Sequence, residues 1–311
     1  MVLKRIYPDG SSTDMKELDI LILGGGWTAT FLIPLLGETN LSFAATTTDG
    51  RQVAGSPTLK WRFDPTAPSK DQTDAFSTLP RARYVLVTFP LKGEGQSELV
   101  VKAYGSTHGD AEGGCRSRFV QLGSTGIWQS DPAQAPWLDR KSPYVNDARA
   151  TAEEELLGLG GCVLNLAGLW GGARDPRHWV DRVATTKEAV RGKKSLHMIH
   201  GVDVARVIVA VVKGDWSKVG HGQRWMVTDG FVYDWWSLFA GWADIGQNDA
   251  DVKSGIMDAE PISQARWVYE LMSEEGVRAL PRSMEALGRC YDTRELWRTL
   301  GIAPLKGGLG I

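Results

Sequence analysis

The sequence predicts an α/β protein, with a doubly wound parallel sheet followed by a smaller carboxyl-terminal lobe that would bind the substrate. Three observations predict this fold class. Short apolar runs alternate with helical patterns through the first half, a glycine-rich turn joins the first run to the first helix, and the pattern changes after about residue 170. The chain has 311 residues, which is enough for one large domain or two modest ones.

The apolar runs of the first half are rich in β-branched residues and do not alternate polar with apolar side chains. That is the pattern of strands buried on both faces, as in a parallel sheet covered by helices. The candidate strands lie, in chain order, in DILILGG, LSFAATT, TLKWRFD, RYVLVTF, RFVQLGS and CVLNLAG. Helices are expected from Trp27 to Leu36, in ELVVKAY and in the 150s.

After about residue 170 tryptophan becomes common and helical patterns dominate, interrupted by the strand-like QRWMVTD. We therefore predict a dinucleotide-binding domain over residues 18–170. Residues 171–311 would form mainly the substrate lobe, with some segments returning to the sheet. The tryptophans should fill the core of that lobe, and some could line an apolar pocket. Residues 1–17 are expected to be a poorly packed leader, and residues 246–255 a loop.

The composition excludes several classes of function. A net charge of -2 gives no electrostatic case for a nucleic acid or an anionic membrane as partner. Three widely spaced cysteines and five scattered histidines predict neither a disulfide framework nor a metal site. The apolar stretch of residues 18–37 is interrupted by three glycines, so it is not expected to span a membrane. We expect a soluble, cytoplasmic protein that binds a small molecule, as a monomer or a homodimer.

The turn after the first candidate strand has the spacing G-x-G-x-x-A at Gly24, Gly26 and Ala29. The first glycine permits a tight turn, the second lets a pyrophosphate approach the backbone, and the third small residue lets the helix pack on the strand. Trp27 and Thr28 open the helix, so their amides would face the phosphates. This pattern predicts a Rossmann fold that binds a dinucleotide.

The end of the second candidate strand should contact the adenosine ribose. A carboxylate there would favour NAD, but the sequence has a threonine run that includes Thr47 and Thr48. Arg51 lies nearby and could pair with a 2′-phosphate, whereas Asp49 falls late for the ribose role. The sequence favours NADP, with NAD as the alternative.

Three further residues are candidates for the cofactor site. Asp64 ends the third candidate strand, and it could bind the adenine amino group or simply cap the following turn. Phe89 ends the fourth candidate strand and Pro90 follows it, at the same edge of the expected sheet.

Four motifs carry a resemblance to a known superfamily. VQLGSTGIWQ is similar to a fifth-strand motif that ends in Val-Tyr-Gly, with Trp128 at the usual tyrosine. A segment after the sixth strand of that superfamily is similar to NLAGLWGGARDPR. Its Ile-His-x-x-Asp-x-Ala motif is similar to MIHGVDVARVIVAVV, and its Leu-Gly-x-x-Pro tail to LGIAPLKGGL. From about Leu18 to its end the chain resembles the extended short-chain dehydrogenase/reductases. That group includes sugar-nucleotide epimerases and dehydratases, and the likeness is greatest to its atypical NAD(P)-binding members.

The resemblance implies a site in which a tyrosine phenol and a serine hydroxyl bind the reacting oxygen, with a lysine four residues after the tyrosine. Ser124 stands at the hydroxyl position, with Thr125 next to it. For the other two roles the stretch SPYVNDARATAEEELL allows two alignments.

Alignment on the helix glutamate Glu153 puts Arg149 at the lysine position and Val145 at the tyrosine position. Alignment on SPY puts Tyr144 at the tyrosine position, with Ala148 where the lysine would be. We prefer the helix register, because residues on one helical turn cannot shift independently. Tyr144 would then lie one residue before the usual place, near the start of the helix.

Three hypotheses of function follow. The first is an NADP(H)-dependent oxidoreductase that acts on a small, fairly apolar carbonyl or alcohol. In it Ser124 and Tyr144 would bind the reacting oxygen, and Arg149 would orient the nicotinamide ribose. The second is a non-redox dehydratase, isomerase or cyclase on the same scaffold, which the missing lysine favours. The third is a binding protein that senses NADP(H). For His200 we expect a turn-fixing and capping role rather than a catalytic one.

Overall fold

The computed structural model describes residues 17–109, 117–129, 136–245 and 260–309. The expected leader, apart from its last residue, and the loop at 246–255 lie outside the described residues. Among the described residues, no helix is both long enough and apolar enough to cross a membrane.

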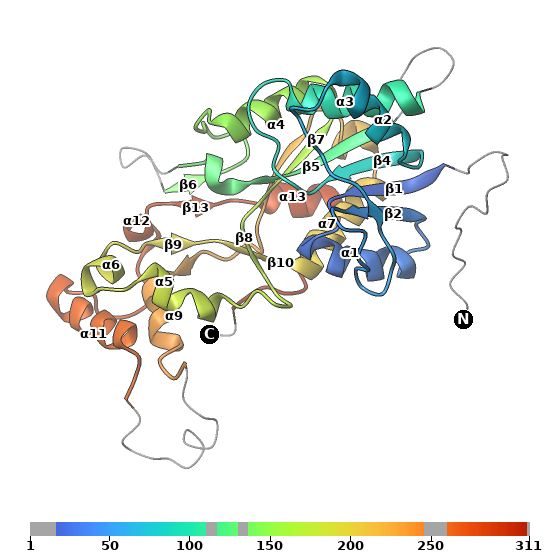
Figure 1. Ribbon diagram of the computed structural model, residues 1–311. Coiled ribbons are helices and arrows are strands. Elements are labelled where there is room, and N and C mark those ends of the chain that lie inside the picture. Colours follow the sequence, from blue (N-terminus) through green and yellow to red (C-terminus); the bar gives the residue numbers. More distant parts are fainter. Residues whose placement is uncertain (1–16, 110–116, 130–135, 246–259, 310–311) are drawn as a thin grey trace.

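A seven-stranded sheet forms the centre of the molecule, and all its neighbouring strands are parallel (Figure 1). The chain builds outward from the first strand in one direction and then returns to build in the other, so the order reverses between β1 and β4. In spatial order the strands are β11 (Arg224–Val227), β7 (Cys162–Leu166), β5 (Arg118–Ser124), β4 (Ala82–Val87), β1 (Leu18–Leu23), β2 (Phe43–Thr47) and β3 (Leu59–Lys60).

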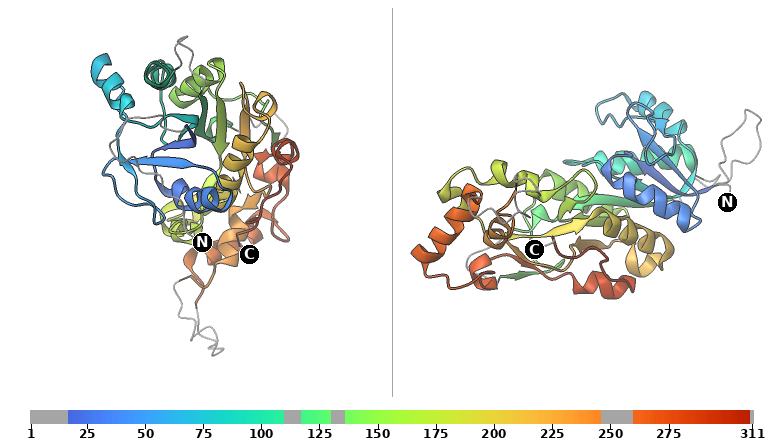
Figure 2. Two further views of the ribbon diagram at one scale, coloured as in Figure 1. Left: turned by 90° about the vertical axis from the view of Figure 1, so that its right-hand side faces the viewer. Right: turned by 90° about the horizontal axis from the view of Figure 1, so that it is seen from below.

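Helices cover both faces of this sheet (Figures 1 and 2). Helices α1 (Trp27–Glu38) and α7 (Gly201–Lys213) pack together on one face, and α2 (Ser69–Ser77), α3 (Gln96–His108) and α4 (Ala148–Gly158) lie on the other. In β1, Ile20 and Ile22 belong to the core under α1, whereas Leu21 and Leu23 belong to the opposite core. This two-sided burial is why the strands read as continuous apolar runs, and it confirms the predicted doubly wound fold.

The third candidate strand is shorter than predicted. Only Leu59 and Lys60 pair with β2, at the exposed edge of the sheet. From Trp61 onward the aromatic side chains pack together instead. The ring centroids of Trp61 and Phe76 are 5.2 Å apart, and those of Phe63 and Phe89 are 5.4 Å apart.

The second half of the chain builds a separate core, which is the lower left part of Figure 1. Trp235, Trp236 and Trp242 are buried in it, as the sequence predicted for the tryptophans of this lobe. Three two-stranded ladders frame it: β8 (Gly168–Trp170) with β10 (Met198–His200), β9 (Ser195–Leu196) with β12 (Tyr233–Asp234), and β6 (Trp137–Leu138) with β13 (Cys290–Tyr291).

The other described helices of the second half are short, apart from α11, which has 13 residues. Those of the lobe are α5 (Val180–Val183), α6 (Lys187–Arg191), α9 (Trp235–Gly241), α11 (Ser263–Glu275) and α12 (Met284–Leu287). The helices α8 (Trp216–Val219) and α13 (Arg294–Leu300) instead pack near α7 and β11, beside the main sheet. His200 caps α7, since its Nδ1 accepts a hydrogen bond of 3.1 Å from the Val202 amide, which confirms the expected capping role.

A buried ion pair holds the lobe together. The Arg282 guanidinium lies 2.7 Å from the Asp234 carboxylate and 4.0 Å from the centroid of the Trp236 ring. It also donates to the Lys193 carbonyl, and Asp234 in turn caps α9 through the Trp236 amide. These contacts join three separate segments of the lobe.

We expect Arg282→Ala to lower the free energy of unfolding by about 3–5 kcal/mol, because it leaves the Asp234 carboxylate buried without its partner. Urea unfolding followed by circular dichroism measures this. The matched control is Arg294→Ala, which removes an ion pair to Asp292 whose arginine side chain is 90% exposed. That control should cost much less, because water screens the exposed pair. Equal losses in the two variants would contradict the assignment.

Candidate functional site

The glycine-rich turn lies where the strand order reverses, at the carboxyl ends of β1 and β4. Gly24 has a φ of +92°, and a Cβ on it would lie 2.7 Å from the Thr88 hydroxyl oxygen. The chain itself therefore requires glycine there. A Cβ on Gly26 would meet only the Gly24 carbonyl oxygen, at 4.0 Å, so nothing in the protein requires this second glycine. Space left open by a bare Cα at a helix start fits a pyrophosphate.

The start of α1 lacks a cap from the protein. The helix begins at Trp27, and its N-cap residue Gly26 provides no side-chain hydrogen bond. The amides of Trp27 and Thr28 therefore remain available to a ligand, whereas the Ala29 amide donates to the Gly26 carbonyl. Thr28 and Ala29 are buried against the sheet. The Trp27 indole is engaged elsewhere, because it donates 3.0 Å to the Gly171 carbonyl and lies under the Arg174 guanidinium at 4.6 Å. Trp27 can therefore offer its backbone amide to a cofactor, but not its indole N–H.

Beside the turn is an open pocket of about 510 Å³. The sequence-predicted residues that line it are Gly24, Thr47, Thr48, Phe89 and Pro90. Sequence reasoning missed the other lining residues, among them Trp61, Arg62, Phe63 and Lys92. For Trp61, Arg62 and Phe63 the signal was the third candidate strand itself, where only its last residue, Asp64, was considered.

The chemistry of this pocket is aromatic and cationic. Phe63 and Phe89 are stacked, with an angle of 26° between their rings, and offer flat apolar faces. Arg62 and Lys92 are exposed and form no ion pair with any described residue, and none of the lining residues is a carboxylate. Such a pocket suits a planar base that carries phosphate.

The other predicted cofactor residues do not line the pocket: Gly26, Trp27, Thr28 and Ala29 lie beside it at the start of α1, and Arg51 and Asp64 lie elsewhere. The Arg51 guanidinium pairs with Asp49 at 3.0 Å, on the exposed turn after β2. The Asp64 carboxylate accepts hydrogen bonds of 2.7 and 2.9 Å from the hydroxyl and amide of Thr66, and these bonds lower its pKa. Of the two roles left open by the sequence for Asp64, this geometry corresponds to the cap of the following turn.

Ser124 stands at the carboxyl end of β5, two strands from the glycine turn. Its hydroxyl oxygen accepts 3.1 Å from the Gly126 amide, and this caps the short 3₁₀ helix of Thr125–Ile127. The hydroxyl proton remains available to a ligand. Thr125 is buried, and its carbonyl accepts a hydrogen bond of 2.9 Å from the Tyr291 phenol.

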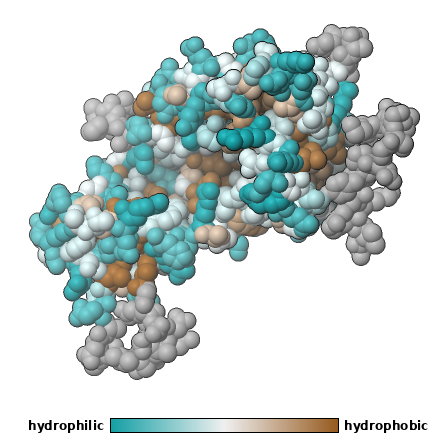
Figure 3. All heavy atoms as spheres, viewed as in Figure 1, coloured by the Kyte–Doolittle hydropathy of each residue, from teal (hydrophilic) through white to brown (hydrophobic). Residues whose placement is uncertain are grey.

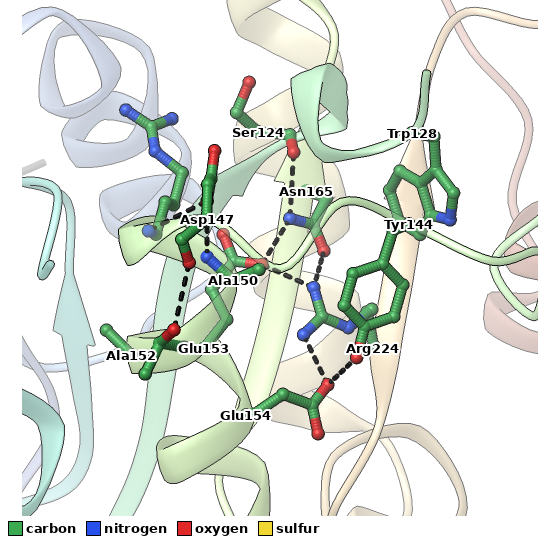
Figure 4. A network of polar contacts seen from close by, with 12 residues as sticks. Ser124, Trp128, Tyr144, Asp147, Ala150, Ala152, Glu153, Glu154, Asn165 and Arg224 are labelled. Atoms are coloured by element: carbon green, nitrogen blue, oxygen red, sulfur yellow. Dashed lines mark hydrogen bonds and ion pairs between the residues drawn. The ribbon is translucent and has the colours of Figure 1, made fainter. Parts of the chain in front are cut away.

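The Tyr144 phenol does not approach Ser124. Helix α4 begins at Ala148 with Asp147 as its cap, so Tyr144 lies before the helix. Its phenol donates to the Glu154 carboxylate, and its ring lies 4.7 Å from the Arg224 guanidinium. Figure 4 shows the phenol and the Ser124 hydroxyl pointing in opposite directions. Burial, and then the bond to Glu154, raises the pKa of Tyr144, which makes it a weaker acid than a free phenol.

Arg149 occupies the first turn of α4, as the helix register predicts. Its guanidinium makes no hydrogen bond or ion pair with any other described residue, so its donors are free to bind a ligand. The structure therefore keeps Ser124 and Arg149 available, and it directs Tyr144 away from them.

A buried polar network lies beneath Ser124 (Figure 4). Glu153 is fully buried, and its Oε2 accepts hydrogen bonds from the Arg224 guanidinium and, at 2.8 Å, from the Asn165 amide. Asn165 donates 3.1 Å further to the Ser124 carbonyl. Burial raises the pKa of Glu153, while Asn165 and Arg224 favour its charged form. Sequence reasoning used Glu153 only to set the helix register, because partners from β7 and β11 cannot be seen along the chain.

This network needs a strand residue without a side chain. A Cβ on Gly123 would lie 2.3 Å from Glu153 Oε1 and 2.5 Å from the Asn165 amide nitrogen. These atoms belong to buried groups that hydrogen bonds hold in place, so they cannot move aside cheaply.

We therefore expect Gly123→Ala to lower the free energy of unfolding by about 1–3 kcal/mol, as for overpacked cores, or more if the network breaks. Chemical denaturation measures this. Gly37→Ala is the matched control, because a Cβ on Gly37 in α1 meets nothing within 4 Å. It should be neutral or stabilise by up to about 1 kcal/mol. A harmless Gly123→Ala would show that the network does not require this close approach.

No protein-family model matches this chain, and no curated protein matches it. Its fold is nevertheless that of known structures. A short-chain dehydrogenase/reductase superfamily protein from Agrobacterium tumefaciens with bound NAD is 11% identical, with a TM-score of 0.58 over 93% of each chain. Vestitone reductase from alfalfa is 15% identical, with a TM-score of 0.57 over 90% of this chain and 91% of the reductase.

A putative NAD-dependent epimerase/dehydratase from Methylobacillus flagellatus is 16% identical, with a TM-score of 0.54 over 93% of this chain and 94% of that protein. At these identities the likeness concerns the fold. The chain shares the Rossmann fold of these structures, as the sequence predicted.

Proposed function

We propose that this chain is an NADP(H)-dependent oxidoreductase that acts on a small, fairly apolar carbonyl compound or alcohol. One observation carries the proposal. The uncapped glycine turn and the cationic aromatic pocket lie beside each other where the strand order reverses, and Ser124 ends a strand at the same edge of the sheet. In open α/β sheets, ligands bind in the crevice at this edge and at this reversal.

The residues present fit a nicotinamide dinucleotide. The amides at the start of α1 would bind the pyrophosphate, and Phe63 and Phe89 would enclose the adenine. The hydroxyls of Thr47 and Thr48 replace the carboxylate that would repel a 2′-phosphate. Arg62 and Lys92 supply the opposite charge, and they favour NADP over NAD.

We expect Arg62→Ala to weaken NADPH binding about tenfold, which corresponds to one charge-assisted hydrogen bond, and to leave NADH binding unchanged. Isothermal titration calorimetry with both nucleotides measures this. Arg51→Ala is the matched control, because its guanidinium is already paired with Asp49. If Arg51→Ala instead removes the preference for NADPH, the 2′-phosphate is bound by Arg51 in the turn after β2 and not by Arg62 after β3.

The cofactor, when bound, supplies the hydride. The protein's part is to bind and polarise the substrate oxygen. The Ser124 hydroxyl would donate to that oxygen, and the fixed charge of Arg149 would stabilise the negative charge that develops there or orient the nicotinamide ribose. Tyr144 joins this site only if its phenol leaves Glu154, since the phenol now donates its hydrogen bond to that carboxylate.

We expect Ser124→Ala to lower kcat/KM for NADPH-dependent carbonyl reduction roughly 100-fold, as loss of one preorganised donor to a developing oxyanion does. Tyr144→Phe should change it far less, because the phenol is bound to Glu154. Oxidation of NADPH, followed by absorbance against a panel of small ketones and aldehydes, measures both. A loss in Tyr144→Phe as large as in Ser124→Ala would return Tyr144 to the catalytic role assigned by the motif.

A second candidate function is a non-redox dehydratase, isomerase or cyclase that holds the nucleotide as a structural group. The arrangement of Tyr144, together with arginine at the lysine position, favours it, since a reductase of this type needs an acidic phenol beside an amine. Tight NADPH binding without oxidation by any carbonyl would support this candidate, or a protein that senses NADP(H).

A further inference from the structure

We propose that the chain has a second ligand site, which binds a small phosphate-bearing anion at the opposite edge of the sheet. A pocket of about 250 Å³ opens there, at the amino ends of β5 and β7. Ser117, Arg118, Gly160, Trp216 and His221 are among the residues that line it. Arg118 begins β5 and Ser124 ends it, so the two sites are about 20 Å apart along one strand.

Arg118 is the centre of this second site. Its guanidinium is oriented by a hydrogen bond of 2.7 Å to the Tyr84 phenol, and it lies 5.4 Å from the Tyr84 ring centroid and 5.5 Å from that of Trp216. A planar cation that is bonded to the phenol and lies beside both aromatic rings keeps its remaining N–H donors in a fixed direction. The group is preorganised for an acceptor that the protein does not supply.

Arg118 forms no ion pair with any described residue, and no acidic residue lines the pocket. Three arginines of low exposure differ. Arg140 pairs with Glu295, Arg224 with Glu153, and Arg282 with Asp234. A half-buried guanidinium without a carboxylate keeps the cost of desolvation without the compensating attraction. An anionic ligand would supply that attraction.

His221 adds a hydrogen-bond donor to this edge, and Arg83 adds a positive charge. The His221 imidazole packs against Gly160, where a Cβ would lie 2.8 Å from its Cε1, and it has no hydrogen-bond partner among the described residues. Its ring can therefore donate into the pocket. The exposed Arg83 lies 5.5 Å from the same Tyr84 ring, again without a carboxylate partner in the described chain.

Shape and charge together indicate the class of ligand. The volume is below the roughly 300 Å³ at which sites for drug-sized ligands begin, so the ligand is small. A guanidinium fork pairs with phosphate or carboxylate through parallel hydrogen bonds, and a neighbouring imidazole adds a third donor. Phosphate, free or as a small phosphomonoester, has oxygens enough to accept from both side chains. This site shares no residue with the cofactor pocket, so the inference does not depend on the proposed function.

The Trp216 indole N–H provides a local probe. Its resonance can be assigned in a ¹⁵N-labelled sample by comparison with Trp216→Phe and followed during titration with inorganic phosphate and, separately, with glycerol 3-phosphate. We expect a saturable shift that sodium chloride at the same ionic strength does not produce. The stronger of the two titrants distinguishes a free phosphate from a phosphomonoester as the ligand.

Arg118→Gln should weaken binding of the titrant about tenfold or more, as loss of a charge-assisted bond does. The matched control is Arg62→Ala, which lies in the cofactor pocket and should leave the Trp216 response unchanged. The proposal is overturned if the shift of the Trp216 resonance never saturates, or if Arg118→Gln binds the titrant as tightly as the unaltered protein does. If Arg118→Gln fails to fold, the exposed His221→Ala provides the test. It should weaken binding severalfold, and an unchanged affinity there overturns the proposal equally.

Discussion

The parallel sheet is buried on both faces, and the rest of the molecule depends on that constraint. Because each central strand sends alternate side chains into two separate apolar cores, the strands cannot shift by one residue without exposing one core and crowding the other. Their ends are therefore held in fixed register. The carboxyl ends of β1, β4 and β5 meet at one edge, which places the glycine turn, the aromatic pocket and Ser124 together.

Below that edge, the chemistry of the candidate site is governed by two adjacent carboxylates on α4. The Glu153 side chain is buried against the sheet and that of Glu154 is half exposed. The Arg224 guanidinium forms an ion pair with both. The buried carboxylate holds the Ser124 backbone through Asn165. The exposed carboxylate takes the Tyr144 phenol (Figure 4). A single arginine from β11 therefore connects the support of the serine to the orientation of the tyrosine.

Unpaired cationic side chains lie at both ends of the parallel strands, and the two ends offer different kinds of site. Arg62, Lys92 and Arg149 lie toward the carboxyl edge, where an extended dinucleotide would pass. Arg118 lies at the amino edge, in a smaller pocket, beside the rings of Tyr84 and Trp216. Three arginines of low exposure, Arg140, Arg224 and Arg282, are instead paired with carboxylates. Unpaired guanidinium groups in pockets are therefore informative about ligands in this protein.

The sequence by itself determined the fold class, the central strands and the glycine turn, because two-sided burial and the turn at Gly24 are local requirements visible in consecutive residues. It also determined the helix register that puts Arg149 on the first turn of α4. Only the tertiary structure decided which cations face the pocket, since Arg62 rather than Arg51 lines it. It likewise decided where the Tyr144 phenol points, because the Glu154 carboxylate that accepts its hydrogen bond is held by Arg224, about 80 positions beyond Tyr144 in the chain. Such contacts arise from the packing of distant segments, and no local pattern encodes them.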